Sequence, residues 1–326
     1  AAQIAGLVIT PLNWRASAEE LDYVLNDAEA KAVVFEAATA ELVDTAIEAI
    51  NVDDDWDDLL AHPPAAAGSR ATVQDKSVML YTSGTTGRGK GVPRRQGAER
   101  AAAMAHVAQN QYARGEVTLG VMPLYHTMGV RSLLASVLIN GHFVCQRRYD
   151  PREALTLIMD HHITNLYLVP TLYHDLLASP FFTATDTSSV RKLGFAGQAM
   201  TDGLLQELDA AFKPELFVNH YGSSEVYTFT IEQDAVSKPG SAGKAGLNQH
   251  IRVVGVGSDD PGAVVAAGEE GEIIASLASD EAFEGYWRRP EADEKSLKEG
   301  WYHTGDMGYF DQDGDLDIAS IAFFAD

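Results

Sequence analysis

One stretch of this chain is built from the residue types that bind phosphate. It reads Leu80-Tyr81-Thr82-Ser83-Gly84-Thr85-Thr86-Gly87-Arg88-Gly89-Lys90-Gly91-Val92 and follows a predicted buried strand over residues 77–81. Glycines let a backbone approach its ligand closely, and backbone N–H groups, hydroxyls and a lysine donate to anionic oxygens. A flexible linker would need neither the preceding strand nor the lysine. The stretch is therefore typical of a phosphate-binding loop.

The pattern also decides between two kinds of phosphate loop. Gly84 to Lys90 fits G-x-x-x-x-G-K, but the P-loop nucleotide triphosphatases require Ser or Thr next, and Gly91 stands there instead. The hydroxyl that would bind magnesium in that fold is therefore absent from its required position. The stretch instead closely resembles the phosphate loop of the adenylate-forming superfamily, which includes acyl- and aryl-CoA ligases, luciferases and peptide-synthetase adenylation domains.

Two further motifs match the same family. A glutamate ends Tyr221-Gly222-Ser223-Ser224-Glu225, and an aspartate ends Gly300-Trp301-Tyr302-His303-Thr304-Gly305-Asp306. Taken alone, Glu225 reads as a surface residue and Asp306 as part of an Asx turn. A carboxylate beyond a strand can also bind Mg²⁺, and a carboxylate can accept two ribose hydroxyls. In the family the glutamate binds Mg²⁺, the tyrosine lies against adenine and the aspartate holds the ribose.

The resemblance implies a site for ATP and Mg²⁺, with coenzyme A as a further substrate. Thr86 and Glu225 would contact the metal, while Gly197, Gln198 and Tyr221 would frame adenine. The residues expected to carry catalysis are Lys90, Thr86, Glu225 and His126. The residues expected to contact the nucleotide are Thr82, Ser83, Gly84, Thr85, Thr86, Gly87, Lys90, Gly197, Gln198, Tyr221, Gly222, Ser223, Ser224, Glu225 and Asp306.

The acid substrate is expected beside a second segment. Pro123-Leu124-Tyr125-His126 resembles the place where CoA ligases set a histidine or aromatic residue against the carboxylate. A lone histidine is more often an ordinary core or surface residue, but this one follows a predicted strand and precedes Gly129. Peptide-synthetase adenylation domains use an aspartate to hold an amino group. The matched segments contain no such aspartate, which disfavours an amino-acid substrate.

The resemblance to the 4-chlorobenzoate-CoA ligase branch covers nearly the whole chain. It implies a ring pocket in which Ala103 is smaller than the expected aromatic residue, while His220, Tyr227 and Thr228 are more polar. We therefore expect a roomier, more polar pocket that takes a hydroxylated or larger ring acid. The full predicted pocket is Ala103, His126, Thr127, Met128, Tyr167, Ala196, His220, Gly222, Tyr227 and Thr228.

The order of elements predicts an α/β fold. A strand over 6–12, a helix capped by Ser17, a strand over 31–36 and a helix over 39–50 give β-α-β-α order, which is typical of a parallel sheet covered by helices. The acidic and Pro/Ala-rich residues 51–76 read as a linker. The later predicted elements are helices over 96–113 and 130–140 and strands over 117–125, 142–147, 163–169, 192–200 and 216–222.

We expect two parts within one large adenylating domain. Residues 1–229 would form layered α/β sheets that bind nucleotide and acid, and residues 230–326 a smaller, mainly β, barrel-like subdomain. The family usually has a segment before the matched start. It also has a Gly-Arg hinge and a mobile C-terminal domain where this chain reads 319–326. The resemblance therefore predicts a chain truncated at both ends.

Composition limits the partners. The chain has 24 Lys and Arg against 47 Asp and Glu, a net charge of −23, which disfavours nucleic acid and anionic membranes. Cys145 is the single cysteine, so no internal disulfide forms and a reducing, cytoplasmic location is expected. No apolar run approaches the roughly 20 residues that span a bilayer. The expected partners are a small carboxylate, ATP and CoA, with a homodimer left open.

These observations together predict an ATP-dependent acid–CoA ligase, acting on an aromatic or cyclic carboxylate. The acid would attack the α-phosphorus of ATP to give acyl-AMP and pyrophosphate, and the thiolate of CoA would then displace AMP. The alternative is a truncated relative that binds ATP or AMP without turnover. Luciferase-like oxygenation of the adenylate has no supporting residue in the sequence.

Overall fold

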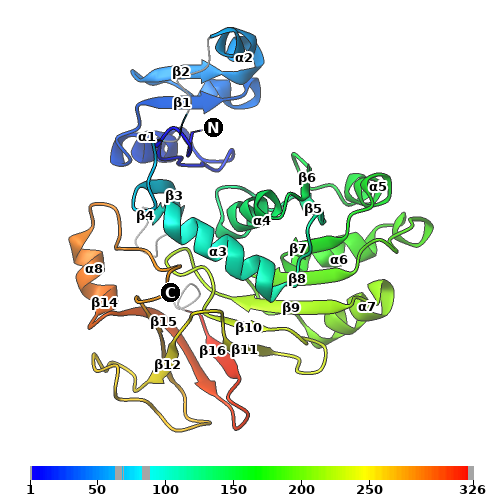
Figure 1. Ribbon diagram of the computed structural model, residues 1–326, viewed down its shortest axis with the longest axis vertical. Coiled ribbons are helices and arrows are strands. Elements are labelled where there is room, and N and C mark those ends of the chain that lie inside the picture. The colour runs from blue at the N-terminus through cyan, green and yellow to red at the C-terminus, as the bar shows by residue number, and fades with distance from the viewer. Residues whose placement is uncertain (1, 63–67, 69, 83–88, 322–326) are drawn as a thin grey trace.

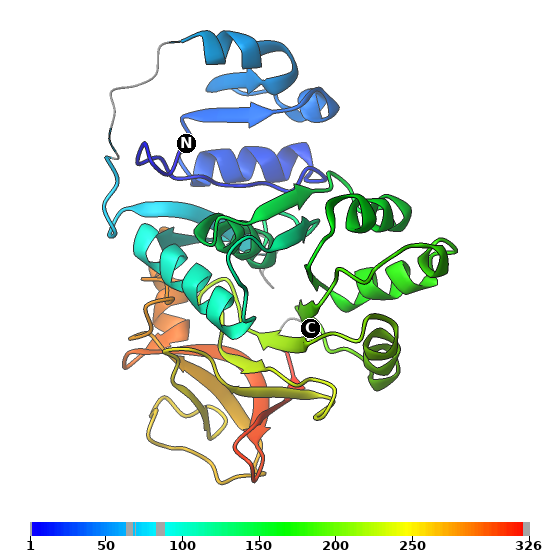
Figure 2. The same ribbon diagram turned by 45° about the vertical axis from the view of Figure 1, so that its right-hand side comes forward.

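The N-terminal part forms a layer of its own. The computed structural model describes residues 2–62, 68, 70–82 and 89–321, and Figures 1 and 2 show this layer at the top, next to strand β3. The predicted capping box of Ser17 and Glu20 is present and begins the first helix. The elements of this layer are α1 (Ala18–Asp27), β1 (Ala32–Phe35), a 3₁₀ helix (Ala37–Leu42), β2 (Glu48–Asn51) and α2 (Val52–Ala61).

Three predictions for this layer were wrong. The segment predicted as a helix over 39–50 is a 3₁₀ turn followed by β2, which pairs in parallel with β1 along its whole length, so strand pairing overrides helix propensity. The predicted linker over 51–76 instead contains the helix α2, which Asn51 caps. Acidic residues in the first turn of α2 interact favourably with the helix dipole. The predicted strand over 6–12 makes one bridge, from Ile9 to Val78, and Leu7 stays 61% exposed.

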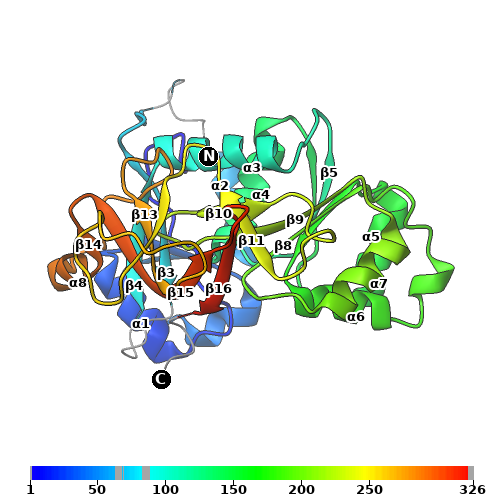
Figure 3. The ribbon, with the colours of Figure 1, turned by 90° about the horizontal axis from the view of Figure 1, so that it is seen from below.

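The central part is a parallel sheet with helices on both faces. The strands run side by side in the order β6, β5, β7, β8, β9, with α3 and α4 on one face and α6 and α7 on the other (Figure 3). The elements are the hairpin β3 (Lys76–Thr82) and β4 (Lys90–Arg95), then α3 (Gln96–Gln109), β5 (Val117–Gly120), α4 (Thr127–Leu138), β6 (His142–Cys145), α5 (Pro151–His161), β7 (Asn165–Leu168), α6 (Pro170–Ala178), a 3₁₀ turn (Phe182–Ala184), β8 (Lys192–Ala196), α7 (Asp202–Phe212) and β9 (Leu216–Tyr221).

Antiparallel strands continue this sheet at the lower left of Figure 1. Strand β10 pairs with β9, and the order then runs through β11, β16, β15, β13 and β12. The second hydrophobic core lies here and takes in Val92 of β4 and Tyr221 of β9. The elements are β10 (Thr230–Glu232), β11 (Ser241–Ala245), β12 (Ile251–Val254), β13 (Gly271–Ser276), α8 (Pro290–Ser296), β14 (Leu297–Lys298), β15 (Trp301–Phe310) and β16 (Leu316–Ser320).

In the part of the chain that the structure describes, no helix combines the length and apolar character needed to cross a membrane. Lys238 forms ion pairs with Asp311, Asp313 and Asp315 around the β15–β16 turn, with Nζ to oxygen distances of 2.5, 3.3 and 2.5 Å. This carboxylate cluster is therefore already satisfied by an internal cation.

A buried polar cluster joins α3 and α4 to the sheet. It consists of His106, Asn110, Arg131, Tyr167 and His220, each at most 2% exposed. The Asn110 amide nitrogen lies 3.1 Å from His106 Nδ1 and 3.1 Å from His220 Nε2. Burial, and next the charge of Arg131, hold the pKa of both histidines well below 6.5. Both imidazoles are therefore neutral at pH 7.

Gly129 is expected to be essential for the start of α4. A Cβ there would lie 2.2 Å from Pro123 O and 2.5 Å from Met122 O, which are backbone atoms that cannot move aside cheaply. Gly129→Ala should lower the free energy of unfolding in urea by about 1–3 kcal/mol. The control is Gly203→Ala in α7, where nothing lies within 4 Å. It should leave stability unchanged or raise it by up to about 1 kcal/mol, and equal losses for both variants would contradict this account.

The neutral histidines should make stability depend on pH. Their folded pKa lies below the unfolded value of 6.5, so below pH 6.5 the unfolded chain binds more protons. Their contribution is therefore fully present above pH 6.5 and is lost as pH falls, by about 1.4 kcal/mol per pH unit for each. His220→Gln should reduce the loss of unfolding free energy between pH 6.5 and pH 5.5 by about 1.4 kcal/mol, measured by urea unfolding. The exposed His174→Gln is the control, and an unchanged slope in His220→Gln would refute the assignment.

Candidate functional site

The two ends of the predicted phosphate loop are held firmly. Thr82 ends β3 and pairs with Lys90, which begins β4. Gly89 O accepts a hydrogen bond from Tyr23 Oη of α1 at 2.8 Å, and a Cβ on Gly91 would lie 3.1 Å from both Met79 Sδ and Trp287 Cβ. The predicted residues Ser83, Gly84, Thr85, Thr86 and Gly87 lie outside the described residues.

A tyrosine that the sequence analysis missed lies between two predicted catalytic residues. Tyr286 Oη donates to Glu225 Oε1 at 2.8 Å, and the Tyr286 ring lies 4.1 Å beneath Lys90 Nζ. Glu225 is 5% exposed, and its main-chain oxygen accepts from Arg94 Nη1 at 3.0 Å and from Phe283 N at 2.9 Å. Lys90 and Glu225 are thereby brought together although they lie far apart in the sequence. No motif marked Tyr286 or Arg94.

Tyr221 and Asp306 also meet, from strands β9 and β15. Tyr221 Oη donates to Asp306 Oδ2 at 2.5 Å. Burial, and next the Asp306 charge, raise the pKa of Tyr221 well above its ordinary value, so it remains a donor. The Asp306 amide donates to Thr304 Oγ1 at 3.0 Å, and the Thr304 hydroxyl donates to Ile273 O at 2.7 Å. The main chain of the turn is therefore held by Thr304, and the carboxylate itself is oriented by Tyr221.

The other predicted nucleotide residues follow the carboxyl ends of adjacent strands. Gly197 and Gln198 come directly after β8, and Gly222 and Ser223 directly after β9. Gly197 has a φ of +83°, which favours glycine, and a Cβ on Gly222 would lie 2.1 Å from Tyr227 O. In parallel α/β sheets this edge is where ligands bind.

The acyl segment reaches the same edge. His126 is the N-cap residue of α4 and is exposed at the surface, yet partial desolvation lowers its pKa below 6.5, so the imidazole is neutral at pH 7. Its ring centroid lies 4.7 Å from that of Tyr125. Thr127 Oγ1 and Ser224 Oγ are 3.0 Å apart, which ties the start of α4 to the turn that holds Glu225.

The predicted acyl pocket separates into two contacting groups. Met128, Tyr167 and Ala196 pack together. Arg131 donates to the main-chain oxygen of Tyr227 at 2.9 Å, to Thr228 Oγ1 at 2.8 Å and to the Tyr167 hydroxyl. The sequence analysis missed Arg131, although a charged residue within the apolar pattern of a predicted helix was a usable signal.

The remaining members lie beside the buried polar cluster. Ala103 is buried on α3, three residues before His106, so the two share one helix face. The His106 ring lies 4.8 Å from the Tyr167 ring and 5.5 Å from the His220 ring. Polar side chains therefore occupy the neighbourhood in which the sequence predicted extra room.

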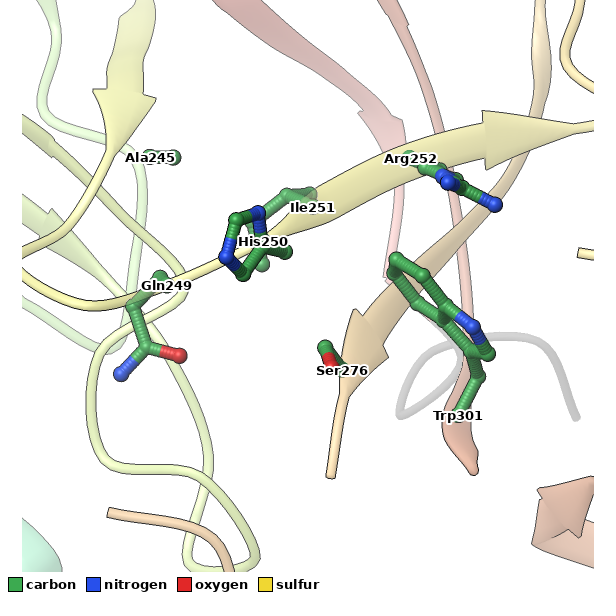
Figure 4. A pocket seen from close by; sticks show the side chains of 7 residues that line it. All are labelled: Ala245, Gln249, His250, Ile251, Arg252, Ser276 and Trp301. Carbon is green, nitrogen blue, oxygen red and sulfur yellow. The ribbon is translucent and has the colours of Figure 1, made fainter. Parts of the chain in front are cut away.

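Two cavities of the described structure lie away from these residues. One, of about 370 Å³, opens on the antiparallel strands, with Arg252 and Trp301 on one side and Gln249 and His250 on the other (Figure 4). Arg252 lies 4.5 Å over the Trp301 ring. The other, of about 400 Å³, lies between α3, residues 247–248 and residues 279–281. Neither is lined by a residue of the predicted acyl pocket.

Comparisons with known proteins agree with this geometry. The family described as AMP-binding enzyme matches residues 1–287. The 4-chlorobenzoate–CoA ligase of Arthrobacter sp. is 32% identical over 244 residues, covering 74% of this chain and 46% of that protein. The feruloyl-CoA synthase of Amycolatopsis sp. is 30% identical over 315 residues, covering 95% of this chain and 62% of that protein.

Solved structures show the same architecture. The N-terminal domain of FACL13 from Mycobacterium tuberculosis has a TM-score of 0.89 at 25% identity, covering 98% of this chain and 81% of that chain. The o-succinylbenzoate CoA synthetase of Bacillus subtilis, in complex with its acyl-adenylate intermediate, has a TM-score of 0.83 at 25% identity, covering 99% and 64%. The predicted α/β fold of an N-terminal adenylating domain is thus confirmed.

The chain spans 46% and 62% of the lengths of the two curated relatives described above. The match to the family nevertheless extends over most of this chain, from residue 1 to residue 287, and includes the phosphate-loop segment and Glu225. The predicted resemblance to adenylate-forming enzymes is therefore confirmed, and the chain belongs to the AMP-binding enzyme family.

Proposed function

We propose that this protein is an ATP-dependent acid–CoA ligase, which forms an acyl-AMP and then an acyl-CoA. The observation that carries the proposal is the meeting of Lys90, Tyr286 and Glu225, with the Tyr221–Asp306 pair in the same region of strands β9 and β15. The lysine, the glutamate and an aspartate able to accept hydrogen bonds from ribose hydroxyls lie near the carboxyl ends of parallel strands, and this arrangement is suited to binding a nucleotide.

In the first step the carboxylate of the acid attacks the α-phosphorus of ATP, and pyrophosphate leaves. Catalysis of such a transfer rests mainly on positioning and on neutralising charge. Lys90 and the backbone of the phosphate loop hold the phosphates, Asp306 holds the ribose, and Gly197, Gln198 and Tyr221 frame adenine. Neutral His126 borders the acid. Because the chain carries a net charge of −23, these local donors must act against the overall field.

Mg²⁺ fits the donor set, since it prefers oxygen ligands and Glu225 offers a carboxylate held by Tyr286. Glu225 and Thr86 would hold the metal, which supplies positive charge toward the phosphate oxygens when bound. In the second step the thiolate of CoA attacks the acyl carbon, and AMP leaves. We infer an aromatic or cyclic carboxylate as the acid, on the pattern of the relatives named 4-chlorobenzoate–CoA ligase and feruloyl-CoA synthase.

The proposal predicts acid-dependent exchange of pyrophosphate into ATP by the intact protein. The panel comprises benzoates, hydroxybenzoates, cinnamates, cyclic acids and straight-chain acids. Exchange should appear with aromatic or cyclic acids, and the best hydroxylated acid should exceed 4-chlorobenzoate. Binding of ATP without exchange for any acid would instead favour a nucleotide-binding protein without turnover. A preference for straight-chain acids would contradict the inferred substrate class.

Glu225 should be needed for the chemical step. Glu225→Gln removes the negative charge while it keeps the size of the side chain, and should lower kcat of exchange on the order of 100-fold, because charge neutralisation at phosphate supplies several kcal/mol. The control is Glu270→Gln, at an exposed glutamate. Thermal melting shows whether both variants are folded. Equal activity of Glu225→Gln and Glu270→Gln would remove Glu225 from the mechanism.

A further inference from the structure

Arg131 is a buried cation without a direct ion pair. It is 2% exposed, and among the described residues no carboxylate oxygen lies within 4.0 Å of its guanidinium. Its three hydrogen bonds go to neutral acceptors, on Tyr227, Thr228 and Tyr167. Arg94 provides the contrast within this protein, because it is equally buried but pairs with Glu99 at 2.9 Å. A buried charge that lacks such a pair is costly.

Arg131 acts electrostatically on the carboxylate of Glu281, which is itself 2% exposed. Burial raises the pKa of Glu281, while Arg131 and then Arg94 act in the opposite direction. Both Glu281 oxygens are buried, and the main chain of Thr228 is the hydrogen-bonding group that acts on this carboxylate. Glu281 therefore acts on Arg131 only through space and does not occupy its donors.

The groups left without a partner around Tyr167 are donors. Arg131 Nε is buried and has no hydrogen-bond partner within the described chain. His106 Nδ1 accepts from the Asn110 amide, so the neutral ring carries its proton on Nε2, and this atom is also buried and unpartnered in the described structure. Arg131 Cζ lies 5.4 Å and the His106 ring 4.8 Å from the centroid of Tyr167. Buried donors of this kind call for an acceptor oxygen.

The position of these donors fits the far end of an acid. Tyr167 packs with Met128 and Ala196 of the predicted acyl pocket, and Arg131 follows the N-cap His126 by five residues of α4. Five residues advance a helix by roughly 7.5 Å and turn it by roughly 140°, so Arg131 lies farther along α4 than His126 and on another side of the helix.

We propose that the acid substrate carries a second carboxylate, and that Arg131 and His106 bind it while the first carboxylate is adenylated. This inference rests on the proposed function and narrows its substrate class. A carboxylate supplies both the direct ion pair that Arg131 lacks and the acceptor oxygens that the two donors require. Arg131 is then a specificity-determining residue, and its hydrogen bonds to Tyr167, Tyr227 and Thr228 hold it in place.

The experiment uses matched pairs of acids with the intact protein. One pair is 4-carboxybenzoate and 4-methylbenzoate, and the other is adipate and hexanoate. For each pair the ratio of kcat/KM in pyrophosphate exchange is measured, and a ratio taken on one preparation does not depend on the folded fraction. The wild type should favour the dicarboxylate in at least one pair by about tenfold or more. Arg131→Met should lower that ratio by about 10-fold to 100-fold, as expected for loss of a charged hydrogen bond.

Two variants guard the interpretation. Arg131→Lys keeps the charge and should retain part of the preference even where Arg131→Met is destabilised. Arg252→Met removes an arginine that stacks on Trp301 outside this region, and should leave the ratio unchanged. A wild type that prefers the monoacid in both pairs would overturn the proposal. So would an Arg131→Met variant that loses activity toward both members of a pair equally, since that is the effect of a purely structural arginine.

The proposed function and this inference fail separately. Absence of exchange with every acid counts against the ligase activity, and calorimetric binding of the same four acids then decides the inference. Tighter binding of a dicarboxylate than of its matched monoacid, lost in Arg131→Met, supports the second-carboxylate site. Equal binding within both pairs, or none, rejects it.

Discussion

The site depends on one constraint, which is that parallel strands end at a common edge. Strands β5, β7, β8 and β9 are paired in parallel, so the turns that follow them must lie next to one another. The turns after β8 and β9 begin with small residues suited to the close approach of a ligand, Gly197 after β8 and Gly222 after β9. The phosphate hairpin and β15 approach the same edge. There Tyr286 contacts Lys90 of the hairpin and Glu225, and Asp306 of β15 contacts Tyr221.

Local signals in the sequence predicted what local physics determines. The helix cap at Ser17 appears as expected, because it depends on residues within one helical turn. The helix predicted over 39–50 failed because β1 offers a parallel partner to residues 48–51, and pairing between distant segments is invisible to propensity. The acidic run after Asn51 read as solvated linker, yet the same charges suit the first turn of a helix.

The candidate site divides in the same way. The motifs identified Glu225 and Asp306 as candidate site residues because each lies within a few residues of a glycine turn. Tyr286, Arg94 and Arg131 were missed because their importance lies in which distant side chain they touch. Arg131 reaches Tyr227 and Thr228 almost a hundred residues further along the chain, with sequence separations of 96 and 97. The sequence showed that the pocket is polar, through His220 and Thr228, but not that a guanidinium organises these residues.

Electrostatics connects the two halves of the site. At the nucleotide end, Lys90 and the carboxylates of Glu225 and Asp306 lie near one another, so a negative ligand meets both signs of charge. At the acyl end, burial and then the charge of Arg131 lower the pKa of the neighbouring histidines and keep them neutral, which leaves Arg131 as the cation of that cluster. An acid without a second carboxylate would leave the buried donors of Arg131 and His106 unpaired, which is energetically costly. A second carboxylate on the acid removes that cost. The far end of the acyl site then follows the same rule as the phosphate end, which is that anions bind where buried donors are unpaired.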